Sequence, residues 1–370
     1  MKYNWQQSDW PKFSYNLKST QVEDALASFN EEIAHITGML KAMSDKLQMD
    51  AMLQLMVAEA IKTSEIEGEF LSRPDVLSSI RNNLGLNHKT ENVKDKRAQG
   101  IGQLMVAVRN TFESPLNEEI LFEWNRMLLQ STTHLKTGAW RKHTEPMQVV
   151  SGTLGKEKIH FEAPPSSNVP KLMKGFIKWF NDTAPGKKLE IKSAPLRSAV
   201  AHLYFESIHP FEDGNGRIGR AIAEKALSQT IGRPVVLSLS QTIEKRKKQY
   251  YQELERAQRS NEITSWIEYF IHTILDAQIQ AREMIELTLA KTRFFDRYKE
   301  KLNERQLKVV RKMLEAVPQG FKGGMTARKY ISITKVSKAT ATRDLQQLAE
   351  MNVLLPQGGG RSIHYSINIS

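Results

Sequence analysis

The chain has 370 residues, and its 25% charged and 40% hydrophobic content is that of an ordinary globular protein, which excludes a disordered or fibrous chain. A formal net charge of +12 indicates a polyanionic partner, such as a nucleotide, a nucleic acid or an acidic protein, without choosing among them. The absence of cysteine excludes disulfides and thiol chemistry, and the polar N-terminus and lack of a long apolar stretch predict a cytoplasmic protein with no membrane contact.

Helical spacing of apolar residues dominates the chain, so we predict a mainly α fold built around a helical bundle. The first fifteen or so residues are rich in aromatic side chains, which we expect to pack onto the main body. From Gln21 to Ile61, apolar residues recur three and four positions apart, as on a helix face that packs against a core. Because residues 296–303 are charged and poor in apolar side chains, we divide the chain into an N-terminal helical segment (1–45), a large domain (46–300) and a small C-terminal domain (301–370).

Residues 148–161 depart from the helical pattern. Two short apolar runs, Val149-Val150 and Ile159-His160-Phe161, flank a glycine-bearing turn at residues 151–155. Pro164-Pro165 follows and ends the run. This order predicts a β-hairpin.

A helix start suited to binding anions is predicted further along the chain. Pro210 stops the preceding helix and leaves His209 at its end. The loop at 213–216 then opens into another helix, and Gly214 and Gly216 allow the backbone to approach a bound group closely. Backbone N–H groups at such a helix start form an anion site.

The side chains around this helix start suit chemistry at phosphorus. Arg217 and Arg220 lie on one face of the helix, where they could hold a polyphosphate. Asp213 is an oxygen ligand suited to Mg²⁺, and His209 can accept a proton from an attacking hydroxyl near neutral pH. Each group alone has an ordinary explanation, as a cap, a turn or a solvated charge. Their occurrence within twelve residues favours a phosphate or nucleotide site with a histidine base.

The run His-Pro-Phe-x-Asp-Gly-Asn-Gly-Arg-x-x-Arg is the signature of the Fic family, and residues 209–220 resemble it at every fixed position. Residues 138–141 and 201–208 resemble the flanks of this motif in the family. The resemblance implies a protein adenylyltransferase, in which a Tyr, Thr or Ser hydroxyl of a target protein, or of the chain itself, attacks the α-phosphate of ATP and pyrophosphate leaves. It implies that His209 is the base and Asp213 the Mg²⁺ ligand.

The resemblance also implies which residues bind ATP and which bind the target. The implied ATP-binding residues are Phe211, Gly214, Asn215, Gly216, Arg217, Arg220, Tyr250 and Tyr251. The two tyrosines would lie on the adenine side, although they could equally be core aromatic residues. The predicted hairpin corresponds to the family's flap, whose edge aligns the target by strand addition through Val149, Val150, Ile159, His160 and Phe161.

The segment from Thr63 to Gly68 lies near the end of a predicted helix, which Gly68 would terminate. Its acidic side chains could form a solvated patch, or one of them could pair with an arginine that otherwise holds phosphate. The segment resembles the family's inhibitory motif, with Thr63, Glu67 and Gly68 at the fixed positions. The resemblance implies that Glu67 pairs with Arg220, displaces the γ-phosphate of ATP and keeps resting activity low.

Residues 303–370 carry eleven Lys or Arg against four Asp or Glu. The predicted order of three helices and a hairpin with a glycine-rich tip resembles a winged helix-turn-helix. Ser337 would cap the third helix, and Lys338, Thr340 and Arg343 near its start, with Arg361 on the wing, would contact DNA. Protein contacts, including a homodimer, are the alternative for this module.

Two other functions stay open on these observations. The same site could remove AMP from a modified protein, with Glu67 aligning a water molecule. The chain could also be a DNA-bound regulator that only senses ATP. The sequence does not name the target protein or establish the nucleotide donor.

Overall fold

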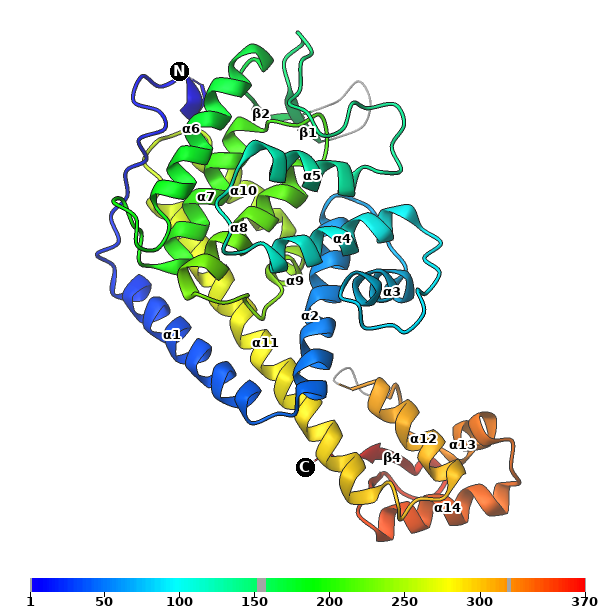
Figure 1. Cartoon of the computed structure of the whole chain (residues 1–370). Coiled ribbons are helices and arrows are strands. Elements are labelled where there is room, and N and C mark those ends of the chain that lie inside the picture. Colours follow the sequence, from blue (N-terminus) through cyan, green and yellow to red (C-terminus); the bar gives the residue numbers. More distant parts are fainter. Residues whose placement is uncertain (1, 152–157, 318–320, 370) are drawn as a thin grey trace. The chain divides into compact units, whose positions relative to one another are not determined.

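The computed structural model of the chain describes residues 2–151, 158–317 and 321–369 (Figure 1). It is mainly helical, as predicted, and divides into two compact units, Met1–Arg282 and Glu283–Ser370. The division falls within α11 (Thr264–Tyr298), whereas the boundary drawn from the sequence at residue 300 lies just beyond the end of that helix. Among the described residues, no helix is both long enough and apolar enough to span a membrane.

The first unit consists of helices and one hairpin. Its helices ahead of α11 are α1 (Thr20–Lys41), α2 (Asp45–Ile66), α3 (Arg73–Asn83), α4 (Lys96–Asn110), α5 (Glu118–Leu128), α6 (Val169–Asp182), α7 (Ala194–Ile208), α8 (Asn215–Ile231), α9 (Leu239–Lys245) and α10 (Lys247–Ala257), with short 3₁₀ turns at Asn4–Gln6 and Ser166–Asn168. The apolar stripe from Gln21 to Ile61 forms two helices, α1 and α2, where the sequence suggested one. The break has a local cause, because Ser44, the residue before α2, has an extended backbone with ψ 153°.

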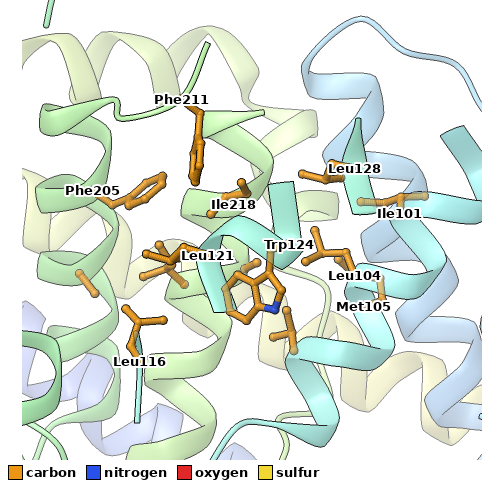
Figure 2. Packing of buried hydrophobic residues seen from close by; sticks show 14 of the residues in the cluster. Ile101, Leu104, Met105, Leu116, Leu121, Trp124, Leu128, Phe205, Phe211 and Ile218 are labelled. Carbon is orange, nitrogen blue, oxygen red and sulfur yellow. The ribbon is translucent and has the colours of Figure 1, made fainter. Parts of the chain in front are cut away.

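The core of this unit surrounds α7, in which every residue from Ala194 to Ile208 is buried. Figure 2 shows side chains of α4, α5, α7 and α8 meeting around Trp124. Phe211, which belongs to the loop between α7 and α8, also points into this cluster and is 1% exposed. The loop that carries the sequence motif is therefore anchored in the core by one of its own side chains.

The predicted hairpin is present as the antiparallel strands β1 (Gln148–Ser151) and β2 (Lys158–Glu162), with an irregularity in register between Val149 and Val150. Residues 152–155 of the predicted turn at 151–155 lie outside the described residues. The aromatic N-terminus packs onto the main body, as expected. The Tyr3 ring meets Phe161 of β2 edge-on at 5.2 Å, and Trp10 meets Tyr204 of α7 at 5.4 Å.

The second unit contains α12 (Glu304–Glu315), α13 (Ala327–Thr334), α14 (Lys338–Glu350), β3 (Leu354–Gln357) and β4 (His364–Ile367), with a 3₁₀ turn at Gly360–Ser362. This is the predicted order of three helices followed by a hairpin. Ser337 caps α14, since its Oγ accepts a hydrogen bond from the N–H of Thr340 at 3.2 Å. The buried Asp344 of α14 ties the three helices together by accepting hydrogen bonds from Arg305 and Tyr330.

Candidate active site

A cavity of about 720 Å³ lies in the first unit where the loop between α7 and α8 faces the hairpin and α10. The motif contributes the side chains or backbone of His209, Asp213, Gly214, Asn215, Gly216 and Arg220 to its wall. The hairpin contributes Val149, Val150, His160 and Phe161, and α10 contributes Tyr250 and Tyr251. The structure thus brings residues from three separate stretches of the sequence, the hairpin, the motif and α10, into one cavity.

His209 ends α7 in a left-handed conformation, with φ 49° and ψ 61°. This conformation is uncommon for a residue with a side chain and is maintained only where neighbouring contacts hold it. The N–H of His209 donates to the Phe205 carbonyl at 2.9 Å, which completes the last turn of α7. The imidazole lines the cavity, so a proton acceptor is available there.

Arg141 holds the backbone around His209 from behind. Its Nε donates to the His209 carbonyl at 2.8 Å, and its Nη2 donates to the carbonyls of Ile208 and Pro164. The side chain is 1% exposed, and burial lowers the pKa of Arg141 to about 10. The sequence analysis placed Arg141 only in the run that flanks the motif and assigned it no role. Its partners are backbone carbonyl groups far away in the sequence, which no pattern of side chains reveals.

Replacing Arg141 by methionine should destabilise the protein by roughly 1–3 kcal/mol, since buried carbonyl groups lose their donor. Urea denaturation followed by circular dichroism measures the change. The control is Arg256→Met, because Arg256 is 69% exposed and its ion pair with Glu253 should contribute little. Equal stability of the two variants would show that the Arg141 contacts do not support the fold.

The motif loop is fastened by two asparagines. Asn215 accepts from the Phe211 N–H at 2.9 Å and donates to the Phe211 carbonyl at 2.8 Å. Asn125 of α5 donates to the Asp213 carbonyl at 3.0 Å. The Phe211 ring, placed by the resemblance among the ATP-binding residues, lies in the core 5.1 Å from Trp140 and outside the cavity wall. Packing of the Phe211 ring in the core anchors the loop, which explains why the motif has an aromatic residue at this position.

The start of α8 offers a site for an anion. Gly214 precedes it with φ 86°, and no side chain of the described residues caps the first backbone N–H groups. Asp213 is 50% exposed beside it, with Oδ1 2.5 Å from the Gly214 nitrogen. The described residues contain no cluster of three or more acidic or histidine side chains that could hold a metal alone. Asp213 is an oxygen ligand of the kind that Mg²⁺ prefers.

The predicted contact between Glu67 and Arg220 is present. Nη2 of Arg220 lies 2.7 Å from Oε1 of Glu67, and the same guanidinium donates to Oγ1 and the carbonyl of Thr63 at 2.7 and 2.9 Å. Arg220 is buried; burial alone would lower its pKa, but the Glu67 carboxylate raises it above the usual value. A Cβ at Gly216 would lie 2.3 Å from Glu67, so glycine is needed for this approach.

A second ion pair, absent from the sequence predictions, joins the same two segments. Nη1 of Arg217 lies 2.9 Å from Oε1 of Glu69, and Arg217 is 4% exposed. Gly68, with φ 83°, turns the chain at the end of α2 and places Glu67 and Glu69 on the two arginines. The two acids are thus paired and do not form a solvated patch; Glu65 instead pairs with Lys62. The sequence indicated the Glu69–Arg217 pair only by placing an acidic residue on each side of Gly68, the glycine that ends the helix.

The other predicted site residues differ in their surroundings. Val150 and Ile159 face each other across the hairpin and are 49% and 40% exposed, whereas Phe161 is buried against Tyr3. His160 Nδ1 lies 2.7 Å from Glu255 of α10.

The tyrosines of α10 are also unlike each other. Tyr250 is buried and its hydroxyl lies 2.7 Å from His202, while Tyr251 is partly buried beside Lys247. Tyr250 therefore has the surroundings of a core aromatic residue with one edge at the cavity.

In the second unit, the start of α14 presents Lys338 and Arg343 to solvent, with Thr340 half-buried. The backbone of Arg361 lies in the 3₁₀ turn of the hairpin, and its side chain is outside the described part of the structure.

Comparison with protein families places this site in a known class. Residues 115–227 match the model of the Fic/DOC family, so the chain contains a Fic/DOC domain. Residues 3–86, which include α2 and the Glu67–Glu69 segment, match a model described as a domain of unknown function, DUF4172.

Among curated relatives, the chain is similar to a protein named probable protein adenylyltransferase from Aquifex aeolicus (strain VF5), with 36% identity over 67 residues. The match covers 18% of this chain and 19% of the relative, so the chain spans about a fifth of that relative.

Solved structures also resemble the chain. One is a Fic family protein from Desulfovibrio desulfuricans G20, with a TM-score of 0.56, 18% identity and coverage of 95% and 96% of the two chains. Another is a Fic domain containing signaling protein from Bacteroides thetaiotaomicron VPI-5482, with a TM-score of 0.52, 16% identity and coverage of 72% and 97%. At these identities the likeness concerns the fold alone.

Proposed function

We propose that this protein transfers AMP from ATP to a Tyr, Thr or Ser hydroxyl of a target protein, or of itself. The observation that carries the proposal is one cavity that joins a histidine proton acceptor, an uncapped helix start and a buried arginine. The name of the Aquifex aeolicus relative supports the same reaction. The hydroxyl oxygen would bond to the α-phosphorus, its proton would pass to His209, and the bond from the α-phosphorus to the bridging oxygen would break and release pyrophosphate.

The phosphates of ATP would lie at the start of α8, because the backbone N–H groups and the positive end of the helix dipole favour anions there. Arg217 and Arg220 would contact the distal phosphates, and Asp213 would hold Mg²⁺, which supplies charge neutralisation for the leaving pyrophosphate. Tyr250 and Tyr251, which both line the cavity, would border the adenine. The exposed pair Val150 and Ile159 would align the target segment along the hairpin.

In this proposal the structure corresponds to a resting state. Both arginines of the motif already bind carboxylates, Arg220 with Glu67 and Arg217 with Glu69. A guanidinium engaged in this way cannot also hold phosphate with the same donors. Transfer would require the segment at 67–69 to move away from α8.

The reaction is tested with the Glu67→Gly protein, ATP and MgCl₂, with and without a cell lysate that supplies candidate targets. Intact-mass spectrometry should show one or more AMP groups added to this chain, and labelled ATP should mark a target protein. ATP binding without any label transfer would contradict the proposal and favour a nucleotide sensor. Loss of AMP from a pre-modified protein would favour the reverse reaction.

A second candidate function, DNA binding by residues 303–370, is favoured by the excess of basic residues and by the exposed Lys338 and Arg343 at the capped start of α14. With roughly four phosphate contacts, the slope of log K against log salt should be about −3.6. Fluorescence anisotropy of the full chain with a mixed-sequence duplex measures it.

The double variant Lys338→Ala, Arg343→Ala should reduce that slope by about 1.8. The control is Lys178→Ala, since Lys178 lies on α6 in the first unit and is 75% exposed. If the full chain binds no duplex at low salt, the module serves protein contacts instead.

A further inference from the structure

We propose that Glu206 is a positioning residue for His209: its carboxylate accepts the Nδ1–H of the imidazole and leaves Nε2 unprotonated toward the cavity. The proposal rests on the proposed transfer reaction, in which His209 accepts the proton of the attacking hydroxyl. Glu206 lies three residues ahead of His209, one turn back on α7. Neither the sequence motif nor the family resemblance assigned it a role.

The geometry leaves few partners for Nδ1 of His209. This atom is buried, and none of the described residues forms a hydrogen bond with it. Oε2 of Glu206 is 3.5 Å away, slightly longer than a hydrogen bond of ordinary length. Buried ring nitrogens are nearly always satisfied in folded proteins, and hydrogen bonds in resting active sites are often long before substrate binds. A small rotation of either side chain would complete the contact.

The charge state of Glu206 suits an acceptor. The residue is 4% exposed, and such burial alone would raise the pKa of its carboxyl group. The adjacent imidazole of His209, with the nearby His202 and Arg220, nevertheless lowers the pKa of Glu206 below its ordinary value. The carboxylate is therefore ionised near neutral pH, where it can hold one tautomer of the neighbouring imidazole.

Gly219 provides a further indication that the packing of α8 against α7 accommodates the Glu206 carboxylate. A Cβ at Gly219 would lie 2.2 Å from Oε1 of Glu206 and 3.2 Å from the ring of His202. Gly219 lies inside α8 without a positive φ, and alanine would stabilise such a helix by roughly 1 kcal/mol. The glycine thus costs helix stability and makes room for the carboxylate.

A purely structural role is the alternative, because His202 and Glu206 share one face of the buried helix α7. Nε2 of His202 lies 2.7 Å from the Tyr250 hydroxyl, which ties α7 to α10. A structural role predicts that changes at Glu206 alter stability and ATP binding. A positioning role predicts a loss in kcat with an unchanged KM for ATP, together with a change in the imidazole tautomer.

The experiment compares Glu206→Gln, Glu206→Leu and Gly219→Ala, each combined with Glu67→Gly so that transfer can be measured. Glutamine keeps an uncharged acceptor, leucine removes the acceptor, and Gly219→Ala displaces the carboxylate without removing its charge. We expect kcat to fall by about 10–100-fold in Glu206→Leu, the effect typical of groups that orient a functional side chain, and by less in Glu206→Gln. Gly219→Ala should resemble Glu206→Leu, with KM for ATP unchanged in all three.

Nitrogen-15 NMR of the imidazoles gives a readout independent of activity, with His209 assigned by its absence from a His209→Ala sample. The Nδ1–H tautomer should dominate with Glu206 in place and become mixed in Glu206→Leu. An unchanged kcat, an unchanged tautomer, or a higher KM for ATP at constant kcat would overturn the proposal. If Glu67→Gly itself transfers no AMP, the proposed function fails, while the tautomer measurement still tests the contact. If the leucine variant does not fold, Gly219→Ala provides the same comparison.

Discussion

His209→Ala is expected to abolish AMP transfer while ATP still binds. In the proposed reaction His209 would accept the proton, whereas the helix start and the arginines that would hold the phosphates belong to α8 and stay in place. Loss of a general base typically lowers the rate by ~10²–10⁴-fold. The assay follows label transfer from ATP in the Glu67→Gly background, and isothermal calorimetry measures ATP binding.

A second variant at the same position separates the effect of losing the imidazole from the effect of straining the backbone. Because His209 has φ 49°, alanine would be strained there, whereas asparagine adopts this conformation more readily. His209→Asn should therefore be as inactive as His209→Ala yet more stable. Transfer at the parental rate in either variant would show that His209 is not the base, and loss of ATP binding would show that the loop had collapsed.

Glu67→Gly is expected to increase AMP transfer by about 10–100-fold. The carboxylate of Glu67 bonds to the buried guanidinium of Arg220, and a hydrogen bond to a charged group contributes roughly 1.5–3 kcal/mol. Without this carboxylate, Arg220 no longer has to break the bond to Glu67 in order to contact the γ-phosphate, while its hydrogen bonds to Thr63 remain. A gain of that size in free energy corresponds to the expected increase in rate. Arg220→Ala breaks the same pair but also removes the phosphate contact, so it should remain inactive.

The second ion pair supplies a matched comparison within the same segment. Glu69→Gln should raise transfer less than Glu67→Gly, because glutamine keeps an oxygen that can accept from Arg217, and Arg217 also lies 3.5 Å from Asp213. The double variant should exceed either single variant. Initial rates at saturating ATP decide the order. Transfer by Glu67→Gly at or below the parental rate would contradict inhibition by this segment, and AMP removal assisted by Glu67 would then be the better explanation.

The local features of this protein follow from its sequence, because each depends on neighbours within a few residues. Helical spacing predicts the bundle, Pro210 and Gly214 predict the end of one helix and the start of the next, and Ser337 predicts the start of α14. The motif groups His209 with Asp213 and the arginines because all lie on one loop and the helix after it. The resemblance to a family then indicated Glu67 as the partner of Arg220, a contact between residues 153 positions apart.

Only the tertiary structure decides the contacts whose partners are distant or are backbone atoms. Arg141 acts on carbonyl groups, Glu69 reaches Arg217 across the helix interface, and Phe211 turns from the loop into the core. Gly219 occupies a variable position of the motif, and its significance depends on a carboxylate that approaches from α7. Such contacts arise from the packing of whole helices, which fixes the distances between side chains that the order of residues along the chain leaves undetermined.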